Sequence, residues 1–302
     1  MRSWIRFSGL VGVVALAGCS VVEQEQRPSP GVVLRSTGTP AEPVSGVANA
    51  PTGAPILWPG SAPAIYAKSA IVIDADSGRT LFQKNADSIR QVASTQKLLT
   101  ALIVAEAGNL DGPVVIQSID TFVEPTKVGF RPGQVYSRRQ LLSALLVHSC
   151  NDAAVALGRD NAGSVAAFAA VMNARAASMG ALSSHFVNPN GLPAPQYSTA
   201  RDMARIAYRA YRHPELRAIM RMPGYNFQFN SGRSSYLKST NKLLGVCPGV
   251  DGMKTGFTNA AGRCLVTSAT IGGRHFIVVQ LGSKTSYIFD DAARMLSWAA
   301  TH

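Results

Sequence analysis

The sequence predicts an α+β fold in which the N- and C-terminal parts of the folded chain share one sheet. Three observations support this prediction. A strand pair opens the folded part, Ala- and Leu-rich helical patterns fill the middle, and strand patterns dominate the last third before a closing helix. Strands at both ends with helices between them are typical of an antiparallel sheet flanked by helices.

The opening strand pair is predicted at Ser69–Asp74 and Thr80–Gln83, because both segments are rich in β-branched and large apolar residues. The stretch Asp76–Arg79 between them contains the Ser-Gly pair that is typical of a turn.

Helices are predicted next from apolar residues at helical spacing. They cover residues 94–107, 138–147, 165–179 and 199–212, and a further helical run begins near Asp152. Ser137 and Ser198 are the predicted N-caps of the second and fourth helices, because a serine side chain accepts hydrogen bonds from the first free amides of a helix.

The last third is predicted to consist of strands over residues 225–229, 250–256, 263–271 and 275–281. Gly272-Gly273 is the predicted two-residue hairpin turn between the last two strands. A helix over 285–299 closes the chain, and the sequence has no internal repeats.

The first 63 residues are predicted to lie outside the folded domain. Residues 1–18 place two arginines before an apolar run and end at the Leu16-Ala-Gly-Cys19 sequence, which is typical of a lipoprotein signal peptide with Cys19 as the lipidated residue. An ordinary signal peptide with an unmodified Cys19 is the alternative. Residues 19–63 are rich in Pro, Gly and Ser, so a disordered tether is predicted there, followed by a domain over 64–302.

The chain carries a formal net charge of +12. This charge favours non-specific attraction to the anionic envelope. The signal peptide and Cys19 predict an exported protein that is lipid-anchored to the cell envelope, at the periplasmic or outer-membrane face if the organism is Gram-negative. The expected partners are the membrane and anionic wall polymers, and no nucleic acid. Cys150, Cys247 and Cys264 remain beside Cys19, and either a Cys247–Cys264 disulfide or two reduced thiols is compatible with the sequence.

Ser94 and Lys97 form the first candidate catalytic pair. Their side chains are neighbours on a helix, because residues three apart lie on the same face. A serine hydroxyl needs a base to take its proton, and lysine can be that base when burial and a second cation lower its pKa. Lys254 could be that second cation. The N-terminus of the helix also directs backbone amides at a developing oxyanion.

Two further motifs complete the candidate site. Ser149 and Asn151 follow a predicted helix, where a hydroxyl can relay a proton and a side-chain amide can hold a substrate carbonyl or the base. Lys254-Thr255-Gly256 lies on a predicted strand, where the lysine and threonine can hold a carboxylate and the glycine leaves room for a substrate backbone.

Each short pattern also has a purely structural interpretation. Ser149 and Asn151 could cap a helix, and Lys254 could be a surface strand lysine. Ser235-Tyr-Leu-Lys238 and Ser239-Thr-Asn241 match the first two patterns as well, but they adjoin each other and open no apolar helix. Ser94 does open one, so the context favours Ser94.

The three motifs S-x-x-K, S-x-N and K-T-G, in this order, resemble those of the D-alanyl-D-alanine carboxypeptidase family of low-molecular-mass penicillin-binding proteins. The resemblance covers nearly the whole folded part. It includes the segments Ile73–Gly78, Arg131–Gly133, Asn188–Leu192, Ser198–Met203 and Pro248–Gly256. It implies a β-lactamase/transpeptidase-like fold, with an antiparallel sheet flanked by helices and a helical subdomain.

The resemblance also implies residue roles. Ser94 would be the acylated nucleophile, Lys97 the base, and Ser149 with Asn151 would complete proton transfer and substrate positioning. Lys254 and Thr255, beside Gly256, would bind the substrate carboxylate, and the amides of Ser94 and Phe257 would form the oxyanion hole. Arg201 would support carboxylate recognition. The middle residue of S-x-N is usually small in the family, so Cys150 would put a thiol at the cleft edge.

The activity implied by the resemblance is removal of the terminal D-alanine from peptidoglycan stem pentapeptides, with β-lactams as covalent inhibitors. A DD-endopeptidase that cleaves D-alanyl cross-links is the alternative, because the chain lacks the C-terminal β-rich domain of many carboxypeptidases in this group. A β-lactamase and a non-catalytic wall-binding lipoprotein are less favoured. The five histidines are scattered and no metal or nucleotide motif is present, so no metal and no cofactor is expected.

Overall fold

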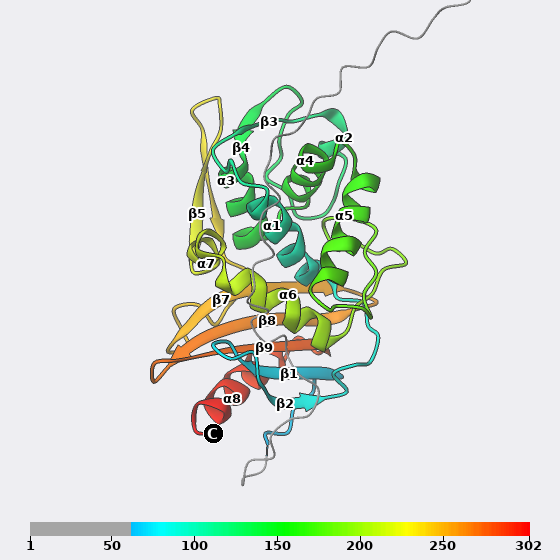
Figure 1. The fold of residues 1–302 in the computed structure, drawn as a ribbon. Coiled ribbons are helices and arrows are strands. Elements are labelled where there is room, and N and C mark those ends of the chain that lie inside the picture. The colour runs from blue at the N-terminus through cyan, green and yellow to red at the C-terminus, as the bar shows by residue number, and fades with distance from the viewer. Residues whose placement is uncertain (1–61) are drawn as a thin grey trace, which may run out of the picture. The chain divides into compact units, whose positions relative to one another are not determined.

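The computed structural model describes residues 62–302, which contain a five-stranded antiparallel sheet with helices on both faces (Figure 1). The predicted signal peptide, the predicted lipidation site at Cys19 and nearly all of the predicted tether lie outside the described residues. Within residues 62–302 no helix combines the length and the apolar character needed to cross a bilayer.

The sheet joins the two ends of the folded chain in the order β2-β1-β9-β8-β7. Its strands are β1 (Ser69–Asp74), β2 (Thr80–Lys84), β7 (Val250–Thr258), β8 (Gly262–Ile271) and β9 (Arg274–Ser283). The shared sheet and the Gly272-Gly273 turn are therefore confirmed. β1 is buried along its whole length because it pairs with β2 on one side and β9 on the other.

Alternate residues of β1 enter two different cores, as the period of a strand requires. Ala70 and Val72 pack in the cluster that contains Leu296 of α8 (Ile288–Ala300). Ile71 and Ile73 join the larger cluster on the opposite face, which includes Ile206 of α6 (Ala200–Arg212). The sheet is thus covered by α8 below and by α6 with the helical part above (Figure 1).

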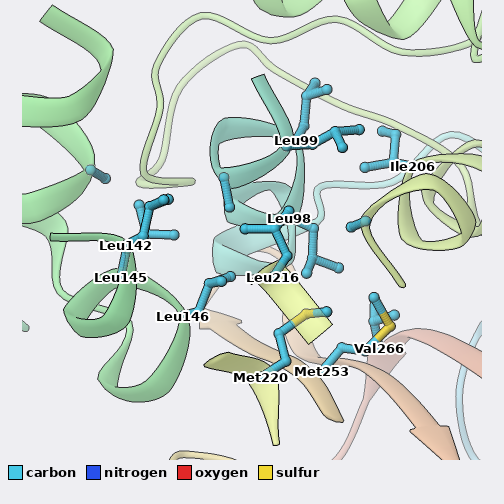
Figure 2. Packing of buried hydrophobic residues seen from close by; sticks show 14 of the residues in the cluster. Leu98, Leu99, Leu142, Leu145, Leu146, Ile206, Leu216, Met220, Met253 and Val266 are labelled. Carbon is cyan, nitrogen blue, oxygen red and sulfur yellow. The ribbon is translucent and has the colours of Figure 1, made fainter. Parts of the chain in front are cut away.

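The helical part is built around α1 (Lys97–Glu106), nine of whose ten residues are buried. Figure 2 shows Leu98 of α1 between Leu142 on one side and Ile206 on the other. The surrounding helices are α2 (Ser118–Thr121), α3 (Arg138–Ser143), α4 (Asn151–Ala162), α5 (Val165–Ser178) and α7 (Pro214–Met220). Two small hairpins flank them, β3 (Pro113–Val115) with β4 (Val135–Ser137), and β5 (Gly224–Gln228) with β6 (Ser234–Lys238).

Several predicted boundaries change in ways that matter for the site. The helix predicted from Ser94 begins with a 3₁₀ turn over Ala93–Gln96 before α1 starts. The Ser137 cap is confirmed, since its side chain accepts from the Gln140 amide, but the helix after it changes at Ala144 into a π-helical turn over Ala144–His148. Ser198 is not the cap of α6, because the adjacent Thr199 accepts from the Asp202 amide.

Candidate active site

Ser94 lies on a tightly constrained turn. The preceding Ala93 has a φ of 48°, a left-handed conformation that alanine rarely adopts, so surrounding structure must hold it. Two glycines allow that close packing. A β-carbon added to Gly256 of β7 would lie 2.9 Å from the Ser94 amide nitrogen, and one added to Gly191 would lie 2.2 Å from the Ala93 carbonyl oxygen. The nucleophile turn is therefore held between β7 and the loop around Gly191.

The Lys97 ammonium group is fully buried directly beside Ser94. Its Nζ lies 2.8 Å from Ser94 Oγ and 2.7 Å from Asn151 Oδ1, and it also donates to the Asn190 carbonyl. These three acceptors match the three N–H groups of a protonated lysine. In the neutral form two N–H groups can keep Asn151 and Asn190, and the lone pair can accept the Ser94 proton.

The surroundings of Lys97 favour that neutral form. Burial lowers the pKa of Lys97 well below its ordinary value, and the positive charge of Lys254 lowers it further. The pKa of Lys254 is itself lowered to about 7 by burial. The two lysines were predicted to be coupled in this way, and both side chains are completely buried.

The π-helical turn positions the second motif. It ends at Ser149, whose φ of 70° reverses the chain so that α4 begins at Asn151. The Asn151 amide donates to the Thr126 carbonyl at 2.7 Å, and its side chain donates to the Glu124 carbonyl at 3.3 Å. Asn151 therefore connects Lys97 to the loop that passes over the start of α4.

Asp152 fixes this same loop from the first turn of α4. Its carboxylate accepts the amides of Val128 at 3.1 Å and Gly129 at 2.9 Å. Burial raises the pKa of Asp152, while these amide hydrogen bonds oppose the rise. Asp152 did not figure among the predicted site residues, because its contribution is to hold backbone in place.

A cleft of about 440 Å³ opens in front of Ser94. Its wall includes Ser149 from the second motif and Thr255, Gly256 and Phe257 from β7. Within the described part of the chain no hydrogen bond holds the Ser149 hydroxyl. The motif residues on the two walls thus face one space, as the motif spacing predicted.

Lys254 does not line this cleft, although Thr255 does. The Lys254 Nζ is buried and donates to the Thr255 carbonyl at 3.0 Å. The cationic side chains on the cleft wall are Lys242 and Arg263, and no aspartate or glutamate is among its lining residues. The Arg263 guanidinium lies 4.3 Å from the centre of the Phe257 ring.

Two further contributing residues, besides Asp152, were not predicted from the sequence. The Thr255 hydroxyl donates to Thr240 Oγ1 at 2.7 Å, so the segment Ser239–Asn241, rejected as a motif, borders the cleft. Asn190 contributes only its backbone carbonyl to Lys97, which no side-chain pattern reveals. The signal for Asn190 was the Asn188–Leu192 segment of the family resemblance.

The loop that carries Asn190 is anchored by buried amide side chains. Gln96 Nε2 donates to the Asn188 carbonyl at 2.6 Å, and Gln196 Nε2 donates to the Leu192 carbonyl at 2.7 Å. Thr100 of α1 donates to the Pro189 carbonyl at 2.7 Å. Gln96 and Thr100, which lie on either side of Lys97 in the sequence, therefore fix the loop whose Asn190 carbonyl accepts a hydrogen bond from Lys97.

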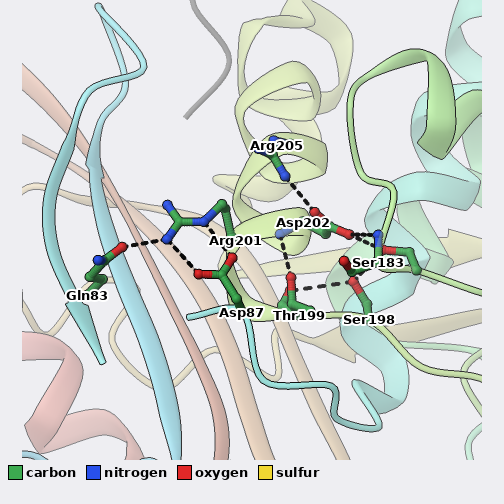
Figure 3. A network of polar contacts seen from close by, with 9 residues as sticks. Gln83, Asp87, Ser183, Ser198, Thr199, Arg201, Asp202 and Arg205 are labelled. Atoms are coloured by element: carbon green, nitrogen blue, oxygen red, sulfur yellow. Dashed lines mark hydrogen bonds and ion pairs between the residues drawn. The ribbon is translucent and has the colours of Figure 1, made fainter. Parts of the chain in front are cut away.

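Arg201 lies elsewhere. It lies in the first turn of α6 and forms a two-pronged ion pair with Asp87, at 2.7 and 2.9 Å, and also contacts Gln83 of β2 (Figure 3). Arg201 is not among the residues that line the cleft. Its expected part in carboxylate recognition therefore has no geometric support, because its guanidinium is engaged in joining α6 to the segment after β2.

The cysteines also depart from expectation in part. Cys150 is fully buried and does not line the cleft, and burial raises the pKa of its thiol. Cys264 borders the cleft instead, with its pKa raised to about 11 by burial. Cys247 and Cys264 are both free thiols, so no disulfide joins them. Within residues 62–302, His, Cys, Asp and Glu side chains form no group of three that could hold a metal ion.

The arrangement contains the parts of an acyl-transfer site. A hydroxyl nucleophile touches a buried amine that favours its neutral form, a second hydroxyl lies across the cleft, and Gly256 of β7 packs closely against the Ser94 amide. Cations without neighbouring carboxylates on the cleft wall suit an anionic substrate group.

Comparisons with known proteins agree with this chemistry. Residues 59–285 match the profile of a family described as D-alanyl-D-alanine carboxypeptidase. The D-alanyl-D-alanine carboxypeptidase DacB2 of Mycobacterium tuberculosis is 36% identical over 241 residues, which span 77% of this chain and 81% of the relative. A D-alanyl-D-alanine endopeptidase of Escherichia coli is 32% identical over 257 residues, spanning 80% of this chain and 79% of the relative.

Solved structures give the same result. The crystal structure of a D-alanyl-D-alanine carboxypeptidase from Mycobacterium tuberculosis matches with a TM-score of 0.77 and 35% identity, over 80% of this chain and 94% of that one. A Streptomyces DD-transpeptidase matches with a TM-score of 0.76 and 30% identity, over 80% of this chain and 100% of that one. The expected transpeptidase-like α+β fold is therefore confirmed.

Proposed function

Because this chain belongs to the D-alanyl-D-alanine carboxypeptidase family of serine peptidases, we propose that it removes the terminal D-alanine of peptidoglycan stem pentapeptides through an acyl-enzyme on Ser94. The observation that carries the proposal is the contact of Ser94 Oγ with Lys97 Nζ at 2.8 Å. Burial and the nearby Lys254 lower the pKa of Lys97, which favours the neutral amine. The family relationship supports the substrate, and this geometry supports the chemistry.

Acylation follows from the geometry. Neutral Lys97 accepts the proton of the Ser94 hydroxyl while Ser94 Oγ attacks the carbonyl carbon of the penultimate D-alanine. The negative charge on the carbonyl oxygen is stabilised by the amides of Ser94 and Phe257. Gly256, the residue before Phe257 on β7, packs closely against the Ser94 amide. Protonated Lys97 is then held by Ser94, Asn151 and Asn190.

Release of D-alanine requires a proton on the leaving amine. The Ser149 hydroxyl, on the opposite wall of the cleft, passes the proton from Lys97 to that nitrogen. Lys97 is neutral again and can accept a proton from the water that hydrolyses the acyl-enzyme. β-Lactams, whose acyl group mimics the peptide, acylate Ser94 by the same first step.

A DD-endopeptidase activity is the second candidate. It would use the same residues on cross-linked peptides, where the leaving group is a second stem peptide in place of free D-alanine. The similarity to the D-alanyl-D-alanine endopeptidase of Escherichia coli favours it, because that relative aligns over as much of this chain as the carboxypeptidases do.

The cellular site forms a separate part of the proposal. The Leu16–Cys19 sequence supports export and lipid attachment at Cys19, with residues 20–63 as a tether between the envelope membrane and the catalytic domain. Labelling of the full chain with a fatty-acid probe in a bacterial host would test this, with Cys19→Ala as the control. Equal labelling of both proteins would refute the assignment.

The function is tested by product analysis. The full chain and Ser94→Ala are incubated with a mixture of pentapeptide monomers and cross-linked dimers, and the products are weighed by mass spectrometry. We expect loss of one D-alanine from the monomer and none with Ser94→Ala. Conversion of dimers to monomers would establish the endopeptidase. Turnover or penicillin labelling of Ser94→Ala would refute Ser94 as the nucleophile.

A further inference from the structure

A second hollow lies outside the catalytic cleft, at the other end of β7. Two adjoining cavities of about 570 and 510 Å³ share Arg217, Arg221 and His275 as lining residues, so they form one groove. Arg212 completes its cationic wall. None of the residues that line the catalytic cleft lines this groove. We call it the arginine groove.

The groove gathers basic side chains from three elements. Arg212 lies in the last turn of α6, Arg217 lies in α7 with Arg221 directly after it, and His275 comes from β9. The C-terminal end of a helix favours a cation, which accounts for one arginine at the end of each helix. It does not account for a second arginine at the end of α7, where Arg221 stands four residues after Arg217, a spacing at which like charges repel.

The carboxylates in the groove are already engaged. Asp251 is nearly buried and accepts from Ser268 at 2.6 Å, Tyr211 at 3.0 Å, Thr270 at 3.1 Å and Arg217 at 3.3 Å. Asp76 pairs with His275 at 2.7 Å.

Arg212 and Arg221 are left with their charge uncompensated. Within residues 62–302 no carboxylate forms an ion pair with either side chain, and both are exposed. The groove therefore has a net positive charge that a bound anion would offset.

Arg217 is held ready for such an anion. Its guanidinium stacks on the Tyr211 ring at 4.3 Å and is held from one end by Asp251. Its Nε is buried and has no hydrogen-bond partner within the described residues. A fixed, planar donor with unused N–H groups suits the tetrahedral oxygens of a phosphate, which accept several hydrogen bonds at once.

We propose that the arginine groove binds a phosphate ester, with Arg212, Arg217 and Arg221 as its donors. Such a group occurs on anionic phospholipid headgroups and on soluble phosphate polymers. The hollow is larger than one phosphate needs, which leaves room for the organic part that carries it. The proposal does not depend on the chemistry at Ser94.

The test compares two double variants that lose the same charge. Arg212→Gln/Arg221→Gln removes two donors of the groove, and Arg131→Gln/Arg209→Gln removes two arginines that do not line it. Calorimetric titration of each full chain with inorganic phosphate measures affinity. We expect the groove variant to bind at least about tenfold more weakly than the wild type, and the control to bind like the wild type.

A second experiment distinguishes the two possible sources of the phosphate, a lipid headgroup and a soluble polymer. Sedimentation with phosphatidylglycerol vesicles, against phosphatidylcholine vesicles, measures headgroup binding, and titration with polyphosphate measures polymer binding. Groove-dependent binding in either arm identifies the ligand. No saturable binding of phosphate by the wild type, or an equal loss in both double variants, would overturn the proposal. Thermal unfolding confirms that each variant is folded.

Discussion

Lys97 combines two properties that are usually separate in a lysine: full burial and three hydrogen-bond acceptors. The three acceptors stabilise the protonated amine after Lys97 has taken a proton. Burial and the nearby Lys254 disfavour that protonated amine before the reaction begins. This balance is what a general base requires, since it must accept a proton and then give it up.

Lys97→Arg should abolish acylation, because arginine keeps the charge and cannot lose its proton. Labelling with a fluorescent penicillin measures the rate, and Lys242→Arg on the cleft wall is the matched control. In the wild type, the rate should fall as the pH drops through the lowered pKa of Lys97, since the protonated amine has no lone pair for Ser94. Near-normal labelling of Lys97→Arg would exclude Lys97 as the base.

Arg263 is the residue on the cleft wall best placed to hold a terminal carboxylate. It stands opposite Phe257 in the β7–β8 ladder, and its Nε donates to Thr285 at 3.0 Å, which leaves the two terminal nitrogens for a ligand. Lys254, the expected partner, is buried behind Thr255 with a pKa lowered to about 7. A buried amine with a lowered pKa is a weaker anchor than a partly exposed guanidinium that keeps its charge.

Arg263→Gln should therefore raise KM about 10- to 100-fold for a pentapeptide with a free carboxylate. The same peptide with a C-terminal amide should show no change, because no charge is recognised. Steady-state assays of both peptides, with Lys242→Gln as the control, measure this. A similar loss on both peptides would mean that Arg263 only supports the cleft wall.

The sequence predicted those site residues whose relative position is determined by their spacing along a helix. Ser94 and Lys97 stand three residues apart on a helix, so their contact followed directly from the pattern. Asn190 and Thr240 could not be found in this way, because one acts through its backbone and the other through a tertiary contact with Thr255. Arg201 was predicted to support carboxylate recognition, but its guanidinium forms an ion pair with Asp87, a tertiary contact that the sequence pattern does not reveal.

At the scale of elements, the approach of β7 to the 3₁₀ turn would determine the shape of the proposed oxyanion site. The strand passes so close to Ala93–Gln96 that a single methyl group would not fit at Gly256. The amides of Ser94 and Phe257 keep their relative positions only while this distance is kept.

Gly256→Ala should lower the acylation rate about 100-fold, because the added β-carbon forces β7 and Ser94 apart. Stopped-flow acylation by a chromogenic cephalosporin measures the rate. Gly272→Ala, at a hairpin turn where nothing lies within 4 Å of the added atom but the φ of 58° disfavours alanine, controls for a general destabilisation of the same sheet. Equal rates for Gly256→Ala and the wild type would show that this contact is not needed.

Most elements were predicted with ends within a few residues, because their apolar spacing is regular. The turns beside the site were not. The π-helical turn at Ala144–His148 and the 3₁₀ turn at Ala93–Gln96 replace the regular α-helix that the apolar pattern implied. The 3₁₀ turn packs closely against β7, and the π-helical turn ends at the left-handed Ser149; neither feature leaves a signal in the local apolar periodicity.

At the scale of the whole molecule, two buried lysines make stability depend on pH. The pKa of Lys254 is about 7 in the folded chain against an ordinary value of 10.5. Between these values the unfolded chain binds more protons, so the free energy of unfolding rises with pH. Below pH 7 the folded chain carries the full cost of burying the charge.

Lys254→Met should raise the free energy of unfolding by a few kcal/mol at pH 6, and the gain should shrink as the pH approaches 10.5. Urea denaturation at pH 6, 8 and 10 measures the gain. Lys242→Met, which replaces an exposed lysine, should give no such trend. A gain that stays constant with pH would mean that packing, and not the lysine charge, is the cause.

The fold class followed from the order of strands and helices, and the sheet order confirms it. The short hairpins β3–β4 and β5–β6 were not predicted as pairs, because strands of three to five residues give little periodic signal. They belong to the helical part, where they close the edge of the core around Phe227.

The pairing of β1 with β9 also sets the order in which the molecule can be completed. Ser69 of β1 pairs with Leu281 of β9, so β1 cannot complete its pairing in the sheet until β9 has been synthesised. Contacts between such distant segments form late and slow the acquisition of structure. The nucleophile turn packs against β7, which pairs with β8 and is synthesised late. The catalytic centre of the nascent chain therefore cannot assemble until synthesis is almost finished.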